Sequence, residues 1–267
     1  YLQILENSAK LHQSSQNRQQ TESLLQQVVD TAVRIYGEKH PEYARQLAHL
    51  GTFARESQQY DVAENALKQA SAILVEQIGK QHPEYARTAI QLGRVYTAMQ
   101  QEERGEALLN EGLKILEETV GKEHPEYAHA LTEIGDCYRT AKRIQEGEPL
   151  LIEAGQIIGN RLGRKHPEYA RTLVKLSKLY SENDDPQQAE KLLLTSAEIL
   201  GTSLGKNHPE FARTLQELAK VYGQKGQAGL EKQLQDKAES ILRKSAAQFQ
   251  TAAVEKFDAE LNEKIRQ

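Results

Sequence analysis

The chain has 267 residues, of which 38% are hydrophobic and 27% are charged, with a net charge of -4 and no tryptophan. This composition is too polar for one large spherical core and too rich in Leu, Ala and Ile for disorder, so it favours a thin helical body over a compact multilayer enzyme. No stretch approaches the roughly 18 apolar residues of a membrane span, and the acidic balance argues against nucleic acid as the main partner.

The single cysteine, Cys137, permits no intrachain disulfide and no cysteine-based metal cage. This usage is typical of a reducing compartment, and we expect a cytoplasmic protein. The first residues lack the basic and apolar regions of a signal peptide. Because the chain begins with Tyr1 rather than methionine, we expect it to be a fragment of a longer protein.

The N-terminal segment, residues 1–38, is predicted to be a degenerate repeat of two helices. Apolar residues at helical spacing between Thr21 and Val33 predict its second helix. Its first helix, over about residues 1–15, lacks the motif that begins every later unit.

That motif, His-Pro-Glu-Tyr-Ala, returns every 42 residues without an insertion. It begins at His40, His82, His124 and His166 and, with Phe in place of Tyr, at His208. A glycine lies three residues before each histidine. Glycine is typical of the position that ends a helix, and proline of the first helical position. Each unit is therefore predicted to contain two helices joined by a polar turn.

Small residues at matched positions predict where the two helices of a unit approach each other closely. The three sets are Gly51, Gly93, Gly135, Ser177 and Ala219; Ala63, Gly105, Gly147 and Ala189; and Ala70, Gly112, Ala154, Ser196 and Ala238. A glycine inside a helix costs about 1 kcal/mol relative to alanine. Its repeated use implies that backbone proximity offsets this cost.

The motif histidines are interpreted as structural residues between repeats rather than metal ligands. Adjacent repeats stack at roughly 8–10 Å, so equivalent imidazoles cannot share one ion. Cys137 is interpreted as a small buried apolar residue. No nucleophile is paired with a base and no glycine-rich phosphate loop occurs, so we expect no metal, no cofactor and no catalytic residues.

The C-terminal segment from Leu230 to Gln267 contains no Pro or Gly and keeps an apolar spacing of three to four residues. It is predicted to be one long helix, or to bend near Ser245 into a separate helix that caps the array, dimerises or touches a membrane. The predicted units, all in one solenoid domain, are 1–38, 39–80, 81–122, 123–164, 165–206, 207–243 and the C-terminal helix 244–267.

These features resemble tetratricopeptide repeats, in the 42-residue form found in kinesin light chains and in many bacterial repeat proteins. The resemblance rests on the His-Pro-acid start and on runs such as Leu92-Gly93…Tyr96, and it covers about residues 1–243. It implies an all-α, right-handed superhelical α-solenoid with a C-terminal capping helix. It also implies that first-helix side chains line a concave groove.

The positions projected onto this groove hold ten cations and five anions, a charge of +5 that leaves -9 for the rest of the chain. Charge-assisted bonds from such a groove suit an acidic peptide or a C-terminal carboxylate. The candidate ligand-binding residues are Arg45, Arg87, Arg94, His129, Arg139, Arg171, Lys175, Lys178, Arg213 and Lys220. The alternative is that each arginine only pairs with the glutamate three residues before it, as in Glu42 and Arg45.

The leading hypothesis is a non-catalytic scaffold that binds a peptide or protein segment in this groove. Two alternatives are a regulatory arm of a larger effector enzyme, such as a caspase-like protease, and an assembly subunit that oligomerises through the C-terminal helix. The chain departs from kinesin light chains at their groove-lining Asn-Asn pair, which is replaced by pairs such as Ala48-His49 and Ile90-Gln91.

Overall fold

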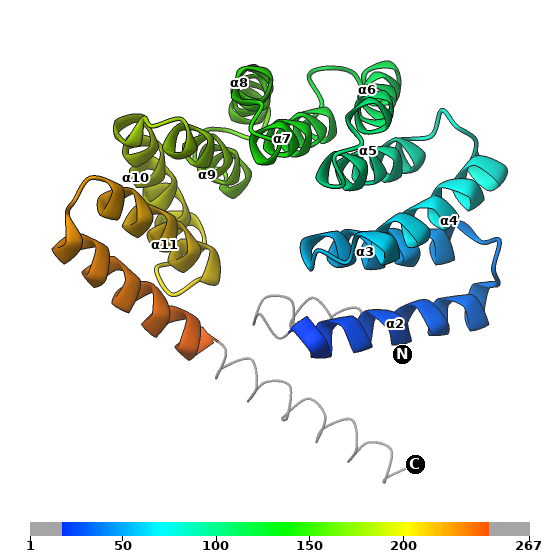
Figure 1. The fold of residues 1–267 in the computed structure, drawn as a ribbon, viewed down its shortest axis with the longest axis horizontal. Coiled ribbons are helices and arrows are strands. Elements are labelled where there is room, and N and C mark those ends of the chain that lie inside the picture. The colour runs from blue at the N-terminus through cyan, green and yellow to red at the C-terminus, as the bar shows by residue number, and fades with distance from the viewer. Residues whose placement is uncertain (1–17, 246–267) are drawn as a thin grey trace, which may run out of the picture. The chain divides into compact units, whose positions relative to one another are not determined.

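The computed structural model describes residues 18–245, and every regular element in that range is an α-helix (Figure 1). The helices are α2 (Arg18–Tyr36), α3 (Pro41–Glu56), α4 (Tyr60–Ile78), α5 (Pro83–Ala98), α6 (Glu102–Thr119), α7 (Pro125–Thr140), α8 (Ile144–Arg161), α9 (Pro167–Glu182), α10 (Pro186–Ser203), α11 (Pro209–Gln224) and a helix over 228–245. The predicted all-α fold class is confirmed. The helix expected over 1–15, and all but the first two residues of the one expected over 244–267, lie outside the described residues.

The chain forms two compact units, Tyr1–Arg164 and Lys165–Gln267. In the first unit, α3 pairs with α4, α5 with α6, and α7 with α8, while α5 also contacts α3 and α7. The first helices of these pairs therefore form one layer, and α6 and α8 lie together on one side of it (Figure 1). In the second unit, α10 packs against both α9 and α11.

The motif begins five helices in the same way. Each proline occupies the first helical turn, and each histidine is the N-cap, because its Nδ1 accepts a hydrogen bond from the backbone N–H of the glutamate two residues later. The N···N distance is 3.0 Å at His40 and 3.2 Å at His208. These histidines thus have a structural role within their own helices, whereas we predicted one between repeats.

Glycine serves two separate purposes in this fold. Gly79, which ends α4, has a φ of 86° and no atom within 4 Å of an added Cβ, so its conformation alone requires glycine. Gly93, Gly105 and Gly112 lie instead at the contact between α5 and α6. An added Cβ would come within 2.9 Å of the Gly105 oxygen at Gly93, and within 2.7 Å of the Ala86 oxygen at Gly112.

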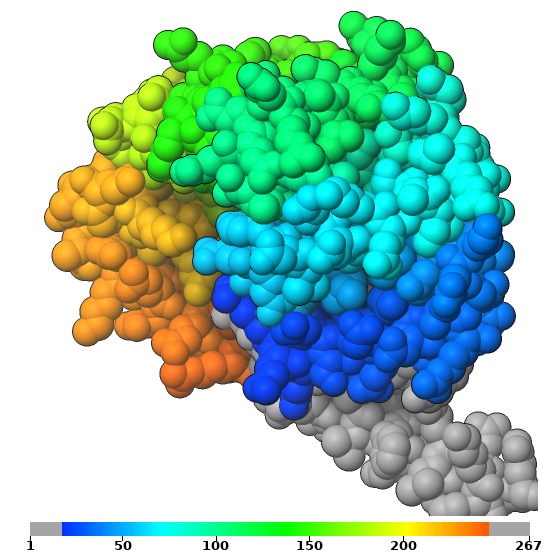
Figure 2. Space-filling model, turned by 45° about the vertical axis from the view of Figure 1, so that its right-hand side comes forward, coloured from blue at the N-terminus to red at the C-terminus, as the bar shows by residue number. Residues whose placement is uncertain are grey.

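The three predicted sets of small residues are all buried, and the contacts at their glycines confirm the predicted close approach within the α3–α4, α5–α6 and α7–α8 pairs. Around them, the apolar core runs from one repeat into the next. One cluster joins Ala54 of α3, Leu67 of α4 and Val95 of α5, which are all at most 1% exposed. A repeat cannot bury this surface alone, so each depends on its neighbour. Figure 2 shows the resulting continuous surface of the first unit, coloured blue to green.

Ion pairs connect the beginnings of successive first helices. Arg45 binds Glu42 of its own helix and Glu84 of the next repeat, where its Nε lies 2.9 Å from Oε1. Arg87 Nη1 lies 2.5 Å from Glu126 Oε1. In the second unit, Arg171 binds Glu168 and makes two 2.8 Å hydrogen bonds to Glu210. We call this row of motif glutamates and following arginines the Arg–Glu ladder.

A methyl group added at the closest helix contact should destabilise the fold. We expect Gly112→Ala to lower the free energy of unfolding by about 1–3 kcal/mol, because the new Cβ must displace the Ala86 carbonyl or the Ile90 side chain. Urea denaturation followed by circular dichroism measures this. Gly229→Ala is the control, since nothing lies within 4 Å of its added Cβ. Equal stability of Gly112→Ala and the wild type would contradict the close approach.

Removing one histidine cap should cost about 1 kcal/mol. His82 is exposed, so His82→Ala loses little besides the hydrogen bond to the Glu84 N–H. We expect His82→Asp to retain most of the stability, because aspartate caps helices well and its charge favours a helix N-terminus. Thermal melts of the three proteins test this, and an equal loss for both variants would exclude capping as the role of His82.

Acid should weaken the ladder. Burial raises the pKa of Glu210, but the hydrogen bonds and positive charge of Arg171 outweigh it and hold this pKa below its ordinary value of 4.5. A depressed carboxylate pKa stabilises the fold above the unfolded value, and this stability is lost as the pH falls through the folded value. We therefore expect Glu210→Gln to lose less stability than the wild type between about pH 5 and about pH 3. Glu198→Gln, at an exposed site on α10, is the control; parallel curves for all three proteins would argue against the ladder.

Candidate functional site

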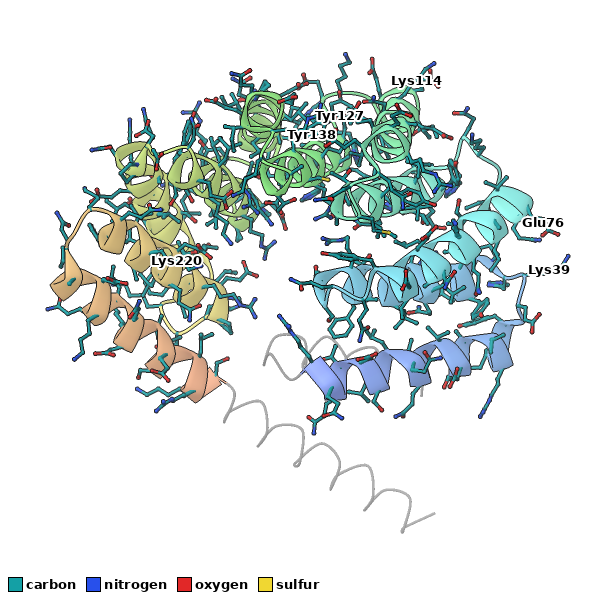
Figure 3. All side chains as sticks on the ribbon, viewed as in Figure 1. Lys39, Glu76, Lys114, Tyr127, Tyr138 and Lys220 are labelled. Carbon is teal, nitrogen blue, oxygen red and sulfur yellow. The ribbon has the colours of Figure 1, made fainter. Side chains whose placement is uncertain are left out.

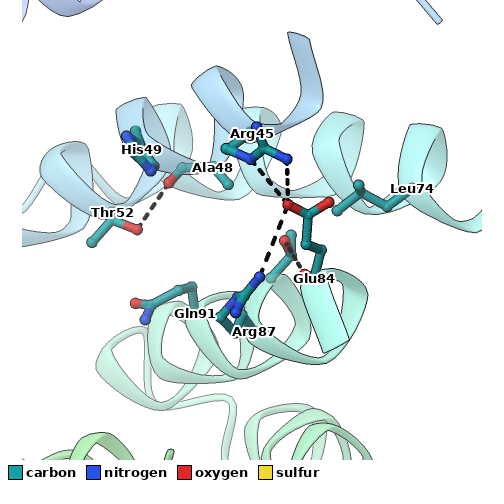
Figure 4. A pocket seen from close by; sticks show the side chains of 9 residues that line it. Arg45, Ala48, His49, Thr52, Leu74, Glu84, Arg87 and Gln91 are labelled. Carbon is teal, nitrogen blue, oxygen red and sulfur yellow. Dashed lines mark hydrogen bonds and ion pairs between the residues drawn. The ribbon is translucent and has the colours of Figure 1, made fainter. Parts of the chain in front are cut away.

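A pocket of about 270 Å³ lies between α3 and α5 (Figure 4). It is lined by Arg45, Ala48, His49, Thr52, Leu74, Glu84, Arg87, Thr88 and Gln91. Arg45, His49 and Thr52 lie on α3, and Arg87 and Gln91 are the counterparts of Arg45 and His49 in the next repeat. First-helix side chains of two repeats thus share one surface.

Three residues of the ladder, Arg45, Glu84 and Arg87, line this pocket. Figure 4 shows Glu84 between Arg45 and Arg87, with ion pairs to both. The Thr52 hydroxyl donates to the Ala48 carbonyl oxygen at 2.8 Å, so it is held against its own helix. His49 is exposed, and its imidazole can donate or accept a hydrogen bond. The pocket therefore presents polar side chains around an apolar floor that includes Leu74.

The ten predicted site residues fall in both units, five in each. The first unit holds Arg45, Arg87, Arg94, His129 and Arg139, and the second holds Arg171, Lys175, Lys178, Arg213 and Lys220. Arg45, Arg87 and Arg171 belong to the ladder. Lys178 and Lys220 both pair with Glu217, at 2.9 and 3.1 Å.

Two of the ten, Arg94 and Arg139, are nearly buried on the inner side of the first unit. Arg94 Nη1 lies 3.2 Å from Glu133 Oε1 and donates to the Gln91 side-chain oxygen at 3.1 Å. Arg139 donates through Nε to Asp136 at 2.9 Å, and the Asp136 residue is only 7% exposed. These pairs hold charge inside the layer, where an unpaired carboxylate would be costly.

The predicted surplus of positive charge disappears when the motif glutamates of the ladder are counted. The predicted groove positions did not include the motif glutamates, although these glutamates bind the same arginines in the ladder. Adding Glu42, Glu84, Glu126, Glu168 and Glu210 cancels the surplus of five. Their spacing was a signal in the sequence, because Glu84, Glu126 and Glu210 lie 39 residues after Arg45, Arg87 and Arg171, and Glu42 and Glu168 lie three residues before Arg45 and Arg171.

Other chemistry is sparse on the described part of the chain. Burial raises the pKa of the Cys137 thiol, which makes it unreactive as a nucleophile at neutral pH. Within residues 18–245, no cluster of three or more His, Cys, Asp or Glu side chains is placed to hold a metal ion. None of the helices in this range is long and apolar enough to cross a membrane.

Comparisons with known proteins agree with this architecture. A tetratricopeptide repeat model matches residues 1–74, 46–118, 84–154 and 126–202. The structure of a kinesin-light-chain-type protein of Podospora anserina, with nearly identical TPR-like repeats, is 26% identical, with a TM-score of 0.59 over 77% of this chain and 98% of that one. No protein of curated function matches the sequence.

Two more distant structures share the fold. BtubC from P. vanneervenii is 18% identical, with a TM-score of 0.61 over 84% of this chain and 91% of that one. NprR in complex with its cognate peptide NprX is 14% identical, with a TM-score of 0.57 over 94% of this chain and 71% of that one. The family match, the helix pairs and the 42-residue unit lead to one conclusion: the chain belongs to the tetratricopeptide repeat family, in its kinesin-light-chain-like form.

Proposed function

We propose that the chain is a non-catalytic interaction module whose first-helix layer binds an extended peptide or protein segment. The observation that carries this proposal is the pocket between α3 and α5, in which polar side chains of two successive repeats surround an apolar floor. A concave site of mixed polarity, formed where two elements meet, is the usual setting for ligand recognition. NprR, which shares the fold, was solved in complex with a peptide.

The repeats themselves support this choice of surface. Positions that begin the first helices keep one residue type through five units, as the motif histidines and prolines do. The pocket position of His49 instead holds Gln91, Glu133, Lys175 and Glu217 in the later repeats. Since every repeat folds in the same way, the fold does not fix the residue type at this position, and this variation supports a role in recognition.

We propose that the segment is acidic and that it contacts the ten candidate ligand-binding residues of the predicted groove. Ladder arginines such as Arg87 already bind two carboxylates, so a partner's carboxylate would have to displace one of them. We therefore assign most of the affinity to the pocket around His49, Thr52 and Gln91. A cytoplasmic location fits the single cysteine, Cys137, which is buried and unpaired.

Filling the pocket with a large side chain tests the proposal. Peptides of about 12 residues would be selected by phage display against the full chain, and their affinities measured by calorimetry. We expect Thr52→Trp to weaken binding at least tenfold, because the indole would occupy the space between α3 and α5. Thr52 suits this test better than Arg87, whose reversal would place a third carboxylate beside Glu84 and Glu126.

Lys114→Trp is the matched control. Lys114 lies on α6, its side chain is 75% exposed, and it points away from the first-helix layer (Figure 3). We expect it to leave the affinity unchanged. Failure to select any peptide, or selected peptides that bind the wild type and Thr52→Trp equally, would overturn the proposal.

A further inference from the structure

The side chain of Arg55, in the last turn of α3, is a cation without a matching anion. It is 17% exposed, and its one ion pair, with Glu56, has a separation of 3.7 Å between Nη2 and Oε1. The guanidinium makes no hydrogen bond to any residue in 18–245, and its Nε is fully buried. A guanidinium carries five N–H donors and keeps its charge at any physiological pH, so leaving it in this state is costly.

The equivalent arginine two repeats later shows what is missing. Arg139 donates to Asp136, three residues before it, through Nε at 2.9 Å and Nη2 at 2.8 Å. Three residues before Arg55 stands Thr52, whose hydroxyl donates to the Ala48 carbonyl oxygen. The repeat thus supplies a carboxylate for Arg139 and none for Arg55.

The adjacent repeat adds a second positive charge beside Arg55. Arg94 occupies the repeat position of Thr52 and Asp136, and its side chain is only 10% exposed. Burial and the charge of Arg94 lower the pKa of the Arg55 guanidinium, while Glu56 and more distant carboxylates only partly oppose this. Arg94 has Glu133 as a partner at 3.2 Å, yet its Nε is also buried without an acceptor. Two neighbouring guanidinium groups of the first-helix layer, those of Arg55 and Arg94, therefore each have a buried Nε without an acceptor.

Arg55 also faces space that a ligand could fill. A pocket of about 620 Å³ is lined by Arg55, Tyr60, Thr97, Ala98, Gln100, Glu102, Thr140, Ala141 and Lys142. This volume lies within the roughly 300–1,000 Å³ of small-molecule sites. The Thr97 and Thr140 hydroxyls donate to backbone carbonyl oxygens, so the charged donors that line this space are the Arg55 guanidinium and the Lys142 ammonium. These two cations outnumber the one carboxylate, Glu102.

We propose that Arg55 is a binding residue for a carboxylate of the docked segment, either an acidic side chain or the chain terminus. A carboxylate matches the planar fork of a guanidinium with two parallel hydrogen bonds. It would also offset the repulsion between Arg55 and Arg94. This assignment rests on the function proposed above, because it gives the chemistry of one group on the peptide that the inner layer binds.

A binding role and a structural role for Arg55 predict opposite effects on stability. We expect Arg55→Met to melt at or above the wild-type temperature, because it removes a largely buried cation that Glu56 and more distant carboxylates compensate only in part. Arg139→Met is the matched control and should melt at a lower temperature, since it leaves Asp136 buried without its partner. A drop in melting temperature for Arg55→Met equal to that of Arg139→Met would overturn the proposal.

Affinity provides the second readout. Arg55→Met should weaken a selected acidic peptide at least tenfold, the loss expected when a charged hydrogen-bonded pair is broken. Peptides with each acidic side chain replaced by its amide, and one with an amidated C-terminus, identify the carboxylate concerned. The peptide in which this carboxylate is replaced already lacks the contact with Arg55, so Arg55→Met should not weaken its binding further. Equal losses for all peptides, or no loss for any, would contradict the assignment.

Binding of sodium acetate tests the carboxylate site at Arg55 separately from the peptide-binding function on which the site rests. In the full chain labelled with ¹⁵N-arginine, we expect acetate to shift the Arg55 Nε–Hε resonance saturably and to leave that of ladder-bound Arg45 in place. A saturable shift with no peptide binding would retain the carboxylate site and reject the peptide function. Pocket-dependent peptide binding without an acetate shift at Arg55 would retain the function and reject the site.

Discussion

The motif glutamate is the residue on which the rest of the structure depends. Glu84 provides the N–H that binds the His82 cap, places a negative charge in the first turn of α5, and binds arginines of two repeats. Helix start and repeat stacking are therefore fixed by the same three residues, His, Pro and Glu. Because the arginine side chains of these pairs are 44–52% exposed, each pair contributes little stability, and their main effect is to set the register between neighbouring first helices.

This register determines which charges remain for recognition. A count of first-helix side chains suggests a basic groove, but the ladder arginines Arg45, Arg87 and Arg171 each bind two glutamates, and the five motif glutamates cancel the counted surplus of five. What distinguishes one repeat from the next is then local: a polar pocket at His49 and Thr52, and an uncompensated guanidinium at Arg55. Selectivity would come from this arrangement rather than from an overall field, which salt screens within about 10 Å.

Much of the fold follows from the sequence because each structural role recurs at a fixed position. The proline and glycine positions and the buried sets of small residues are predicted from the sequence and are confirmed. The histidine cap was not recognised, although the residue before a first-turn proline is where a cap must lie. The left-handed conformation of Gln100 was also missed, and its signal was the glycine at the matching position, Gly226.

The site was harder to predict because its partners are distant in sequence. The acceptor of Arg45 lies 39 residues later, and the charge that most affects Arg55 is Arg94, in the next repeat. Spacing within one helix cannot reveal either contact, since both arise only when repeats stack. The difference between Arg139 and Arg55 is instead local, because Asp136 precedes Arg139 by three residues on α7 whereas Thr52 holds that position on α3.

The claim that the first-helix layer of the first unit is the binding surface can be tested by hydrogen–deuterium exchange of the full chain with and without a selected peptide. The account predicts that the peptide slows exchange in α3 and α5 while leaving α6 unchanged. Protection confined to α4, α6 or α8, with none in α3 and α5, would contradict it.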